Sequence, residues 1–190
     1  MRYLKFIFVV ALILNCGCSS KEMEKILWPS ESTDYYSISK KWTNNQKIYV
    51  GLDEVIDVSC VYKSMDWRKA FVRKWAKVYS LSKEEKDAFS QKVLEEGKES
   101  IEFFVAISST TDELSKIKIL SPLWSIFLVQ NNKKIYPLEV RELEWPYPKI
   151  KEFFPFTNPW QSFYIIRFPY IANFKELMFA GPEGQVVFTW

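Results

Sequence analysis

Apolar and polar side chains alternate through residues 48–62. Only Glu54 interrupts the series of apolar positions, which are Ile48, Val50, Leu52, Ile56, Val58, Cys60 and Tyr62. Because successive side chains of a strand point to opposite faces of a sheet, this period of two predicts one long strand with one buried face. Cys60 lies on that face, so we expect its thiol to be buried and inert rather than redox-active.

The period changes after residue 66 and predicts a helix. Trp67, Phe71 and Trp75 recur at helical spacing, which places them on one arc of the helix surface. The opposite arc is basic, with Lys69, Arg73, Lys74 and Lys77. This basic arc either meets anionic lipid headgroups or faces solvent and pairs with an acidic neighbouring helix.

A second helix is predicted over residues 83–97. Ser82 is followed three residues later by Glu85, which is the pattern of a capping box that satisfies free N–H groups at the start of a helix. The apolar stripe of this second helix is thin. We therefore expect the rest of the domain, and not a membrane, to cover the large aromatic side chains of the first helix.

From residue 101 onward the sequence predicts short strands separated by turns. The expected strands cover residues 101–107, 124–129, 136–140, 163–168, 174–180 and 186–190. Hairpin turns are expected at residues 131–134 and 181–184. Many short strands with such turns indicate an antiparallel sandwich or barrel. The fold class is therefore α+β, and the two helices, at about residues 66–98, form an insertion after the first strand.

The chain begins in the manner of a secreted protein. Arg2 and Lys5 precede an unbroken apolar run at residues 6–14, which is shorter than the roughly 20 residues that a membrane-spanning helix needs. A positive start, a short apolar run and small residues at the boundary describe a secretory signal peptide.

The boundary sequence LNCGCSS, residues 14–20, resembles the lipobox of bacterial lipoproteins. In that family a cysteine is acylated and becomes the N-terminus when the leader is cut. Cys18 fits this role best because Gly17 precedes it, although Asn15 stands where the family usually has leucine. Cys16 is the alternative acylation site, and an ordinary leader or an uncleaved anchor also stays open.

The lipobox resemblance implies an organisation and a location. It implies a signal peptide at residues 1–17 and a lipid on the cysteine that follows. Residues 18–46 are polar, with turn formers and no sustained period, so we expect a lipidated tether there and a folded domain at 47–190. The location that the resemblance implies is the cell envelope. Ser19 stands where aspartate marks retention at the inner membrane in some lipoproteins, so the default destination is the outer membrane, facing the periplasm.

A second resemblance covers residues 121–190. The segments SPLWSIFLVQNNKKIYPLEV, FFPF, FYIIRFPY and GPEGQVVFTW are similar to those of bacterial lipoproteins with an immunoglobulin-like sandwich. The resemblance implies an immunoglobulin-like order for the antiparallel sandwich. It implies no activity, and no catalytic residue is carried over from it.

Composition excludes several classes of function. The chain has no histidine, which excludes Ser-His-Asp and Cys-His catalysis and His-ligated zinc or haem. It has 26 basic and 23 acidic side chains, a balance that gives no support to nucleic-acid binding. If Cys18 is acylated, Cys60 has no partner for a disulfide within the domain. The chain contains no glycine-rich phosphate loop, and we expect no cofactor.

The sequence contains two acidic clusters, Asp53, Glu54 and Asp57 in one and Glu139, Glu142 and Glu144 in the other. The first cluster lacks the spacing of an EF-hand, and a strand would divide its side chains between two faces, so we expect solvated polarity rather than a metal site. The second offers the carboxylate pair that glycoside hydrolysis requires, but an exposed strand face explains it as well.

Residues 145–170 are dense in aromatic residues and prolines. Trp145, Tyr147 and Trp160 either form a recognition surface for glycan or peptide, or fill the core and stiffen its connections. Together the observations predict a non-enzymatic, lipid-anchored envelope protein that acts as an accessory or assembly factor and binds another envelope protein. A glycan- or peptide-binding module that uses residues 145–170 is the alternative, and a carboxylate-only hydrolase is a remote one. The oligomeric state stays open.

Overall fold

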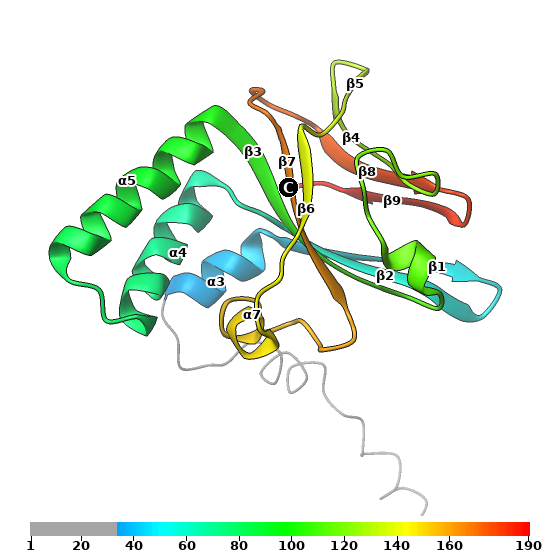
Figure 1. Ribbon diagram of the computed structural model, residues 1–190. Coiled ribbons are helices and arrows are strands. Elements are labelled where there is room, and N and C mark those ends of the chain that lie inside the picture. The colour runs from blue at the N-terminus through cyan, green and yellow to red at the C-terminus, as the bar shows by residue number, and fades with distance from the viewer. Residues whose placement is uncertain (1–33) are drawn as a thin grey trace, which may run out of the picture. The chain divides into compact units, whose positions relative to one another are not determined.

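The structure is a computed structural model that describes residues 34–190 (Figure 1). The helices of this part of the chain are α3 (Asp34–Lys41), α4 (Met65–Val78), α5 (Lys83–Glu99), α6 (Asp112–Ser115) and α7 (Tyr147–Phe153). The strands are β1 (Thr43–Val50), β2 (Asp53–Tyr62), β3 (Ser100–Ser109), β4 (Ser125–Gln130), β5 (Lys133–Ile135), β6 (Glu139–Glu142), β7 (Ser162–Pro169), β8 (Glu176–Gly181) and β9 (Gly184–Phe188).

These strands form two antiparallel sheets that pack face to face. One sheet has the order β1-β2-β3-β7-β6, and the other has the order β5-β4-β8-β9. The main core lies between them and includes Phe103 and Val105 from β3, Ile166 from β7, and Leu177 and Phe179 from β8. The α+β class and the antiparallel sheets are therefore confirmed. The strand order is not the ABED–CFG order of constant-type immunoglobulin domains, so the immunoglobulin-like part of the expectation is not confirmed.

Helices cover the other face of the five-stranded sheet (Figure 1). Alternate residues of β3 point toward them, so Phe104 is as fully buried as Phe103, which faces the sandwich core. Trp67 and Phe71 of α4 are also buried. Trp75 is half-buried, and its ring centroid lies 5.0 Å from that of Phe153 in α7. The expectation that the domain covers the aromatic arc of this helix is confirmed, with α7 supplying part of the cover.

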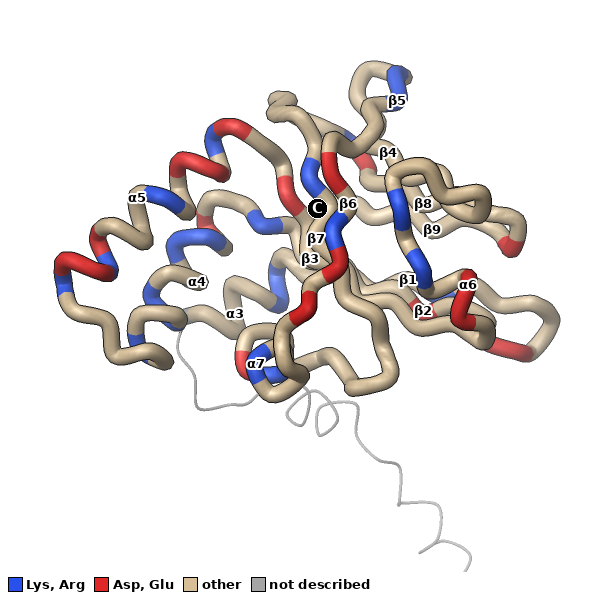
Figure 2. Tube along the Cα trace, viewed as in Figure 1, with Lys and Arg blue, Asp and Glu red and all other residues tan. Residues whose placement is uncertain are grey.

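The predicted helical hairpin is present as α4 and α5. The side chain of Ser82 accepts from the backbone N–H of Glu85, and the Glu85 carboxylate accepts from the backbone N–H of Ser82, so the capping box is confirmed. Basic and acidic residues alternate along α5 (Figure 2), and Val93 is its buried residue. This charge pattern explains why α5 forms the outer layer of the hairpin.

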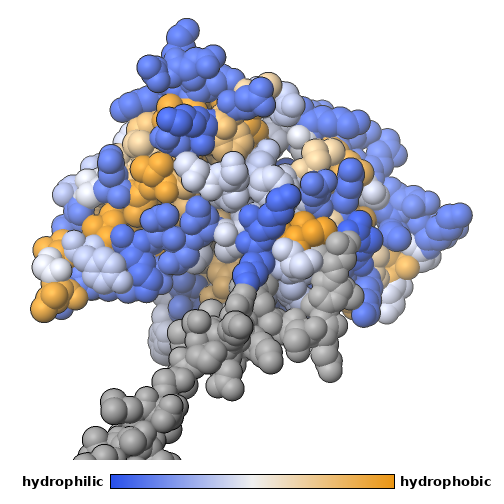
Figure 3. Space-filling view, turned by 180° about the vertical axis from the view of Figure 1, so that it is seen from behind, coloured by the Kyte–Doolittle hydropathy of each residue, from blue (hydrophilic) through white to orange (hydrophobic). Residues whose placement is uncertain are grey.

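The long strand expected at residues 48–62 is wrong, because the chain turns back within it. Gly51 has a φ of +66° and joins β1 to β2, which pair antiparallel. Leu52, expected on the buried face, is 99 % exposed at the turn, and Tyr49 and Val50 are also exposed. Apolar side chains are accordingly visible at the tip of this hairpin (Figure 3). The apolar residues Val50 and Leu52 lie on either side of this turn, and Gly51 between them was the sequence signal for it.

The hairpin expected after β4 is tighter than the sequence indicated. Asn131 and Asn132 both have positive φ, 48° and 61°, and Gln130 pairs with Lys133. Two central residues with positive φ match the twist of a two-residue hairpin turn. The strand expected at residues 136–140 is also wrong, because β5 ends at Ile135 and β6 joins the other sheet.

The boundary between the expected tether and the expected domain needs a correction. Residues 34–46 form α3 and the first part of β1, so the folded domain begins before residue 47. Tyr35 is buried in α3 and its hydroxyl donates to the carbonyl oxygen of Phe153 at 2.8 Å. The signal peptide and the remainder of the tether lie outside the described residues, as does Cys18. No helix within residues 34–190 is long and apolar enough to cross a membrane.

Candidate functional site

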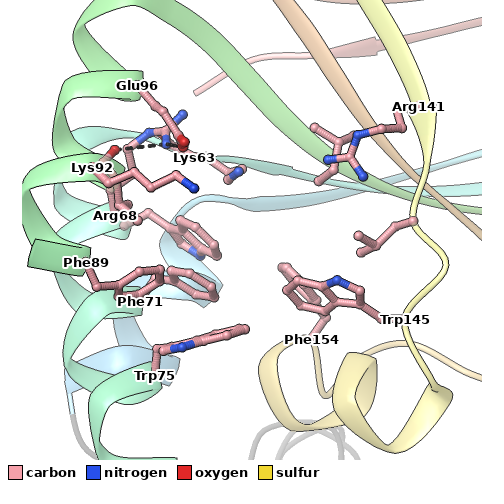
Figure 4. A pocket seen from close by; sticks show the side chains of 14 residues that line it. Lys63, Arg68, Phe71, Trp75, Phe89, Lys92, Glu96, Arg141, Trp145 and Phe154 are labelled. Atoms are coloured by element: carbon pink, nitrogen blue, oxygen red, sulfur yellow. Dashed lines mark hydrogen bonds and ion pairs between the residues drawn. The ribbon is translucent and has the colours of Figure 1, made fainter. Parts of the chain in front are cut away.

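A pocket with a volume of about 300 Å³ lies on the helix-covered side of the five-stranded sheet. We call it the α4–β6 pocket, because α4 and α5 form one wall while β6 and the segment after it form the other (Figure 4). Its lining consists of Lys63, Trp67, Arg68, Phe71, Trp75, Phe89, Lys92, Val93, Glu96, Arg141, Leu143, Trp145, Phe154 and Ile165. The labelled charged side chains gather at one end of the pocket and the labelled aromatic rings at the other.

A buried ion cluster forms the base of the charged end. Arg68 is 1 % exposed, and its Nη2 and the Nζ of Lys63 lie 2.7 Å and 2.6 Å from the same Glu102 oxygen. Arg68 also donates through Nε to the carbonyl oxygen of Lys63 and through Nη1 to that of Val93. Its Nη1 lies 3.8 Å from Glu96 Oε2. Every part of this guanidinium is therefore fixed by a partner, which gives the pocket a rigid cationic floor.

The cluster shifts the titration of its members. Burial alone would raise the pKa of Glu102, but the charges of Lys63 and Arg68 and their hydrogen bonds bring it below its ordinary value. Burial lowers the pKa of Lys63, and the Glu102 carboxylate offsets part of that effect. Two cations share the buried carboxylate of Glu102, and the second carboxylate, Glu96, is more distant from Arg68, at 3.8 Å, and 44 % exposed.

The lowered pKa of Glu102 predicts a dependence of stability on pH. The folded carboxyl stays ionised to a lower pH than the unfolded one, so its stabilising contribution is present above the unfolded value of about 4.3 and is lost as pH falls through the folded pKa. We expect wild type to be more stable than Glu102→Gln at pH 7, with the difference shrinking below about pH 4.3. Urea unfolding of both proteins between pH 3 and pH 7 measures it. A difference that stays constant over this range contradicts the ionised cluster.

Gly97 in α5 is required by the buried arginine. A Cβ atom at this position would lie 2.7 Å from Cδ and Nε of Arg68 and 2.9 Å from Sδ of Met65. Arg68 is held by its hydrogen bonds and has no room to move, so the better helix propensity of alanine does not compensate.

We expect Gly97→Ala to lower the unfolding free energy by about 1–3 kcal/mol, as overpacking of a filled interior does. Gln91→Ala, at an exposed position of the same helix, is the matched control and should change it by less than about 0.5 kcal/mol. Denaturant unfolding of both variants checks the pair. Equal midpoints for the two would show that Gly97 has no packing role.

Aromatic rings from distant parts of the sequence form the other end of the pocket. The ring centroid of Trp75 lies 5.5 Å from that of Phe89 in α5 and 5.7 Å from that of Trp145, which follows β6. Nζ of Lys149 lies 4.7 Å from the ring centroid of Trp75 and 4.3 Å from that of Trp145. These contacts join the two walls, so the aromatic end is a preformed surface.

The structure separates the three residues of the predicted recognition surface. Trp145 lines the pocket. Tyr147 is half-buried, and its hydroxyl donates to the carbonyl oxygen of Thr157 at 2.8 Å. Trp160 is 88 % exposed and is not among the pocket residues. Phe153 and Phe154 of the same segment are buried, so this segment contributes both to the core and to the pocket.

The other candidate residues lie outside the pocket. Glu54 and Asp57 both pair with Lys47, at 2.6 Å and 3.6 Å. Within residues 34–190 no group of three or more acidic or cysteine side chains is arranged to hold a metal ion. Glu139 pairs with Arg167 at 2.8 Å, while Glu142 and Glu144 are exposed. Cys60 is fully buried, as expected, and burial raises the pKa of its thiol well above the ordinary value.

Sequence reasoning missed the buried ion cluster, although two signals were available. Arg68 lies three and four residues before Phe71 and Val72, on the apolar arc of α4. Glu102 stands within the apolar run IEFFVAI. Each of these charged residues lies among apolar positions and is therefore expected to be buried. Because an unpaired buried charge is unfavourable, two such residues of opposite charge predict a buried ion pair.

A comparison with protein-family models finds no match for this chain, and a comparison with curated proteins finds none either. Among solved structures, it aligns with a novel protein of unknown function from Burkholderia pseudomallei at a TM-score of 0.42 and 8 % sequence identity. That alignment covers 81 % of this chain and 80 % of the other. At this TM-score the likeness carries no argument about fold or function.

Proposed function

We propose that the protein is a non-enzymatic, lipid-anchored component of the cell envelope whose folded domain binds a ligand or a partner segment in the α4–β6 pocket. One observation carries this proposal: four basic side chains and a preformed aromatic surface line the same pocket. Ligand sites are typically concave and mostly apolar, with a few polar groups that fix the orientation of the ligand. The partner that we propose is another envelope protein, for which this chain is an accessory or assembly factor.

The anchor is a separate part of the proposal and depends on the sequence alone. The lipobox-like segment favours acylation of Cys18 and a position at the outer membrane, facing the periplasm. Mass spectrometry of the N-terminal peptide, from protein purified out of its native membrane, tests this part. The expected peptide begins at Cys18 and carries the mass of the lipid, whereas an unmodified Cys18 contradicts the anchor.

One residue supports the alternative function, a glycan- or peptide-binding module. Trp145, from the aromatic and proline-rich segment, forms part of the pocket wall. A peptide segment of a protein partner would use the same wall, so the two readings share one site.

Charge reversal inside and outside the pocket tests the proposed binding function. Arg141 lines the pocket and its side chain is 56 % exposed, so Arg141→Glu leaves the core intact. Lys118 is exposed and lies outside the pocket lining, so Lys118→Glu is a control with the same change in charge. We expect wild type and Lys118→Glu to capture the same protein from detergent-solubilised envelope, and Arg141→Glu to lose it. Equal capture by both variants contradicts a role for the pocket.

A further inference from the structure

We infer that the α4–β6 pocket binds an organic monoanion, a single carboxylate attached to an apolar group. This inference rests on the proposed binding function and names the chemical class of the ligand. Two sources have this chemistry: a free carboxylic acid with an acyl or aromatic body, and the C-terminal residue of a peptide that ends in a large apolar side chain.

The charge of the pocket favours a single negative charge on the ligand. The lining contains four basic side chains, Lys63, Arg68, Lys92 and Arg141, and one acidic side chain, Glu96. Behind the lining, Glu102 is shared by Lys63 and Arg68. Glu139 lies 3.6 Å from Nε of Arg141 and is shared with Arg167. Lys92 is therefore the one cation of the lining that has no acidic partner within residues 34–190, and we call it the excess cation. A monoanion supplies the single partner that this cation lacks.

The excess cation has a definite place. No ion pair joins Lys92 to an acidic residue within the described chain, and its side chain extends toward the charged end of the pocket (Figure 4). Arg141 reaches toward the same end from the opposite wall. A carboxylate between these walls would accept from both side chains, and hydrogen bonds of this charge-assisted kind are about twice as strong as neutral ones.

The other end of the pocket requires an apolar group. Phe71, Trp75, Phe89, Trp145 and Phe154 gather there, away from the charged side chains. Lys149 already occupies the faces of Trp75 and Trp145, so a ligand cation would meet a like charge. The aromatic end therefore suits an uncharged ring or chain and disfavours an ammonium group.

The size of the pocket limits the ligand. The volume of about 300 Å³ lies at the small end of the range of ligand pockets, which suits one ring or a short chain.

Three probes with the same apolar body and different charge test the assignment. They are 3-phenylpropionate, 3-phenylpropanol and 3-phenylpropylammonium. Ligand-observed NMR titrations use the full mature chain in lipid nanodiscs, with empty nanodiscs as the blank. We expect 3-phenylpropionate to bind at least tenfold more tightly than the alcohol, and the ammonium compound to bind least. Equal affinities for the acid and the alcohol overturn the monoanion assignment but leave the pocket as a binding site.

Variants identify the site and its charge. Lys92 and Arg141 are both exposed, so Lys92→Glu and Arg141→Glu are expected to leave the fold intact. Thermal unfolding of both variants verifies this. We expect each to weaken 3-phenylpropionate at least tenfold, with Lys118→Glu unchanged. Equal losses for all three variants would mean that the acid responds to net charge alone, which overturns the site. If no probe binds wild type but Arg141→Glu still loses envelope capture, the monoanion inference alone is overturned. If no probe binds and Arg141→Glu captures as well as Lys118→Glu, the proposed function is contradicted as well.

Two further probes distinguish the sources. Octanoate represents a free acyl acid, and N-acetyl-phenylalanine represents a peptide C-terminus, with N-acetyl-phenylalaninamide as its neutral match. Tighter binding of octanoate assigns the pocket to free acids, and tighter binding of N-acetyl-phenylalanine assigns it to peptide C-termini. Binding of the amide as tightly as the acid excludes recognition of the carboxylate and overturns the inference.

Discussion

Arg68→Ala is expected to lower the free energy of unfolding by about 3–5 kcal/mol, the range for removing one partner of a buried ion pair. The variant leaves Glu102 with Lys63 as its remaining cation. It also removes the donor to the carbonyl oxygen of Lys63 and a second donor to that of Val93, which lies inside α5. The penalty arises from groups left buried without partners, so it exceeds the value of a single hydrogen bond. Urea unfolding at pH 7 measures the change.

Arg167→Ala is the matched control for that variant. Arg167 also makes a short ion pair, 2.8 Å from Glu139, but its side chain is 45 % exposed. Solvent screens such a pair, and we expect a loss of at most about 1 kcal/mol. If the two arginine variants lose the same free energy of unfolding, burial does not make the Arg68 ion pair more important for stability than an exposed one.

A triple variant separates the two causes of the Arg68 effect. Lys63→Met, Arg68→Met and Glu102→Leu together remove the three charges that meet at Glu102 and leave the half-exposed Glu96. Apolar replacement of buried ion clusters is often neutral or stabilising. Here the carbonyl oxygen of Lys63 loses its donor from Arg68, whereas that of Val93 lies inside α5 and keeps its helical hydrogen bond, so recovery should be partial. If the triple variant has a lower free energy of unfolding than Arg68→Ala, the loss in Arg68→Ala does not come from leaving Glu102 with one cation fewer. The attraction among the three charges would then itself stabilise the fold.

Local patterns in the sequence predicted the local elements well. The capping box at Ser82 and the helical spacing from Trp67 indicated α4 and α5, because both signals depend on residues within one or two turns of a helix. The β1–β2 turn was missed because Val50 and Leu52 continue the apolar alternation, although both are exposed. Their apolar character belongs to the hairpin tip and not to the core, and periodicity alone cannot make that distinction.

The pocket depends on contacts between segments far apart in the sequence. Trp145 was a candidate because its segment is rich in aromatic residues. Its ring neighbour Trp75, and Phe89 of the same pocket lining, lie far earlier in the chain. The sequence contains the residues that make the pocket and the signals for its buried cluster. Local patterns do not predict that α7 and β6 pack beside α4, because this contact forms only when the helices cover the sheet.

Phe104→Ala is expected to lower the free energy of unfolding by about 3–5 kcal/mol, the usual range for deleting a large buried aromatic side chain. Phe104 is fully buried between β3 and the helical layer. Its ring is parallel to that of Phe154, with the centroids 3.6 Å apart, and it also stacks on Phe163 at 6.1 Å. Trp160→Ala, at an exposed position, is the control and should change stability by less than about 0.5 kcal/mol.

The position of Phe104 makes this variant informative about the pocket as well as about stability. Phe154, its stacking partner, is part of the pocket lining, so a cavity behind it allows that wall to shift. Native-state hydrogen exchange should show a larger loss of protection in α4 and α7 than in β4 and β8, because Phe104 faces the helices. In a double-mutant cycle, Phe104 and Phe154 should be coupled by about 0.5–1.5 kcal/mol. Uniform loss of protection across both sheets and all helices would mean that the helical layer and the sandwich unfold as one unit, and that the pocket wall has no independent freedom to move.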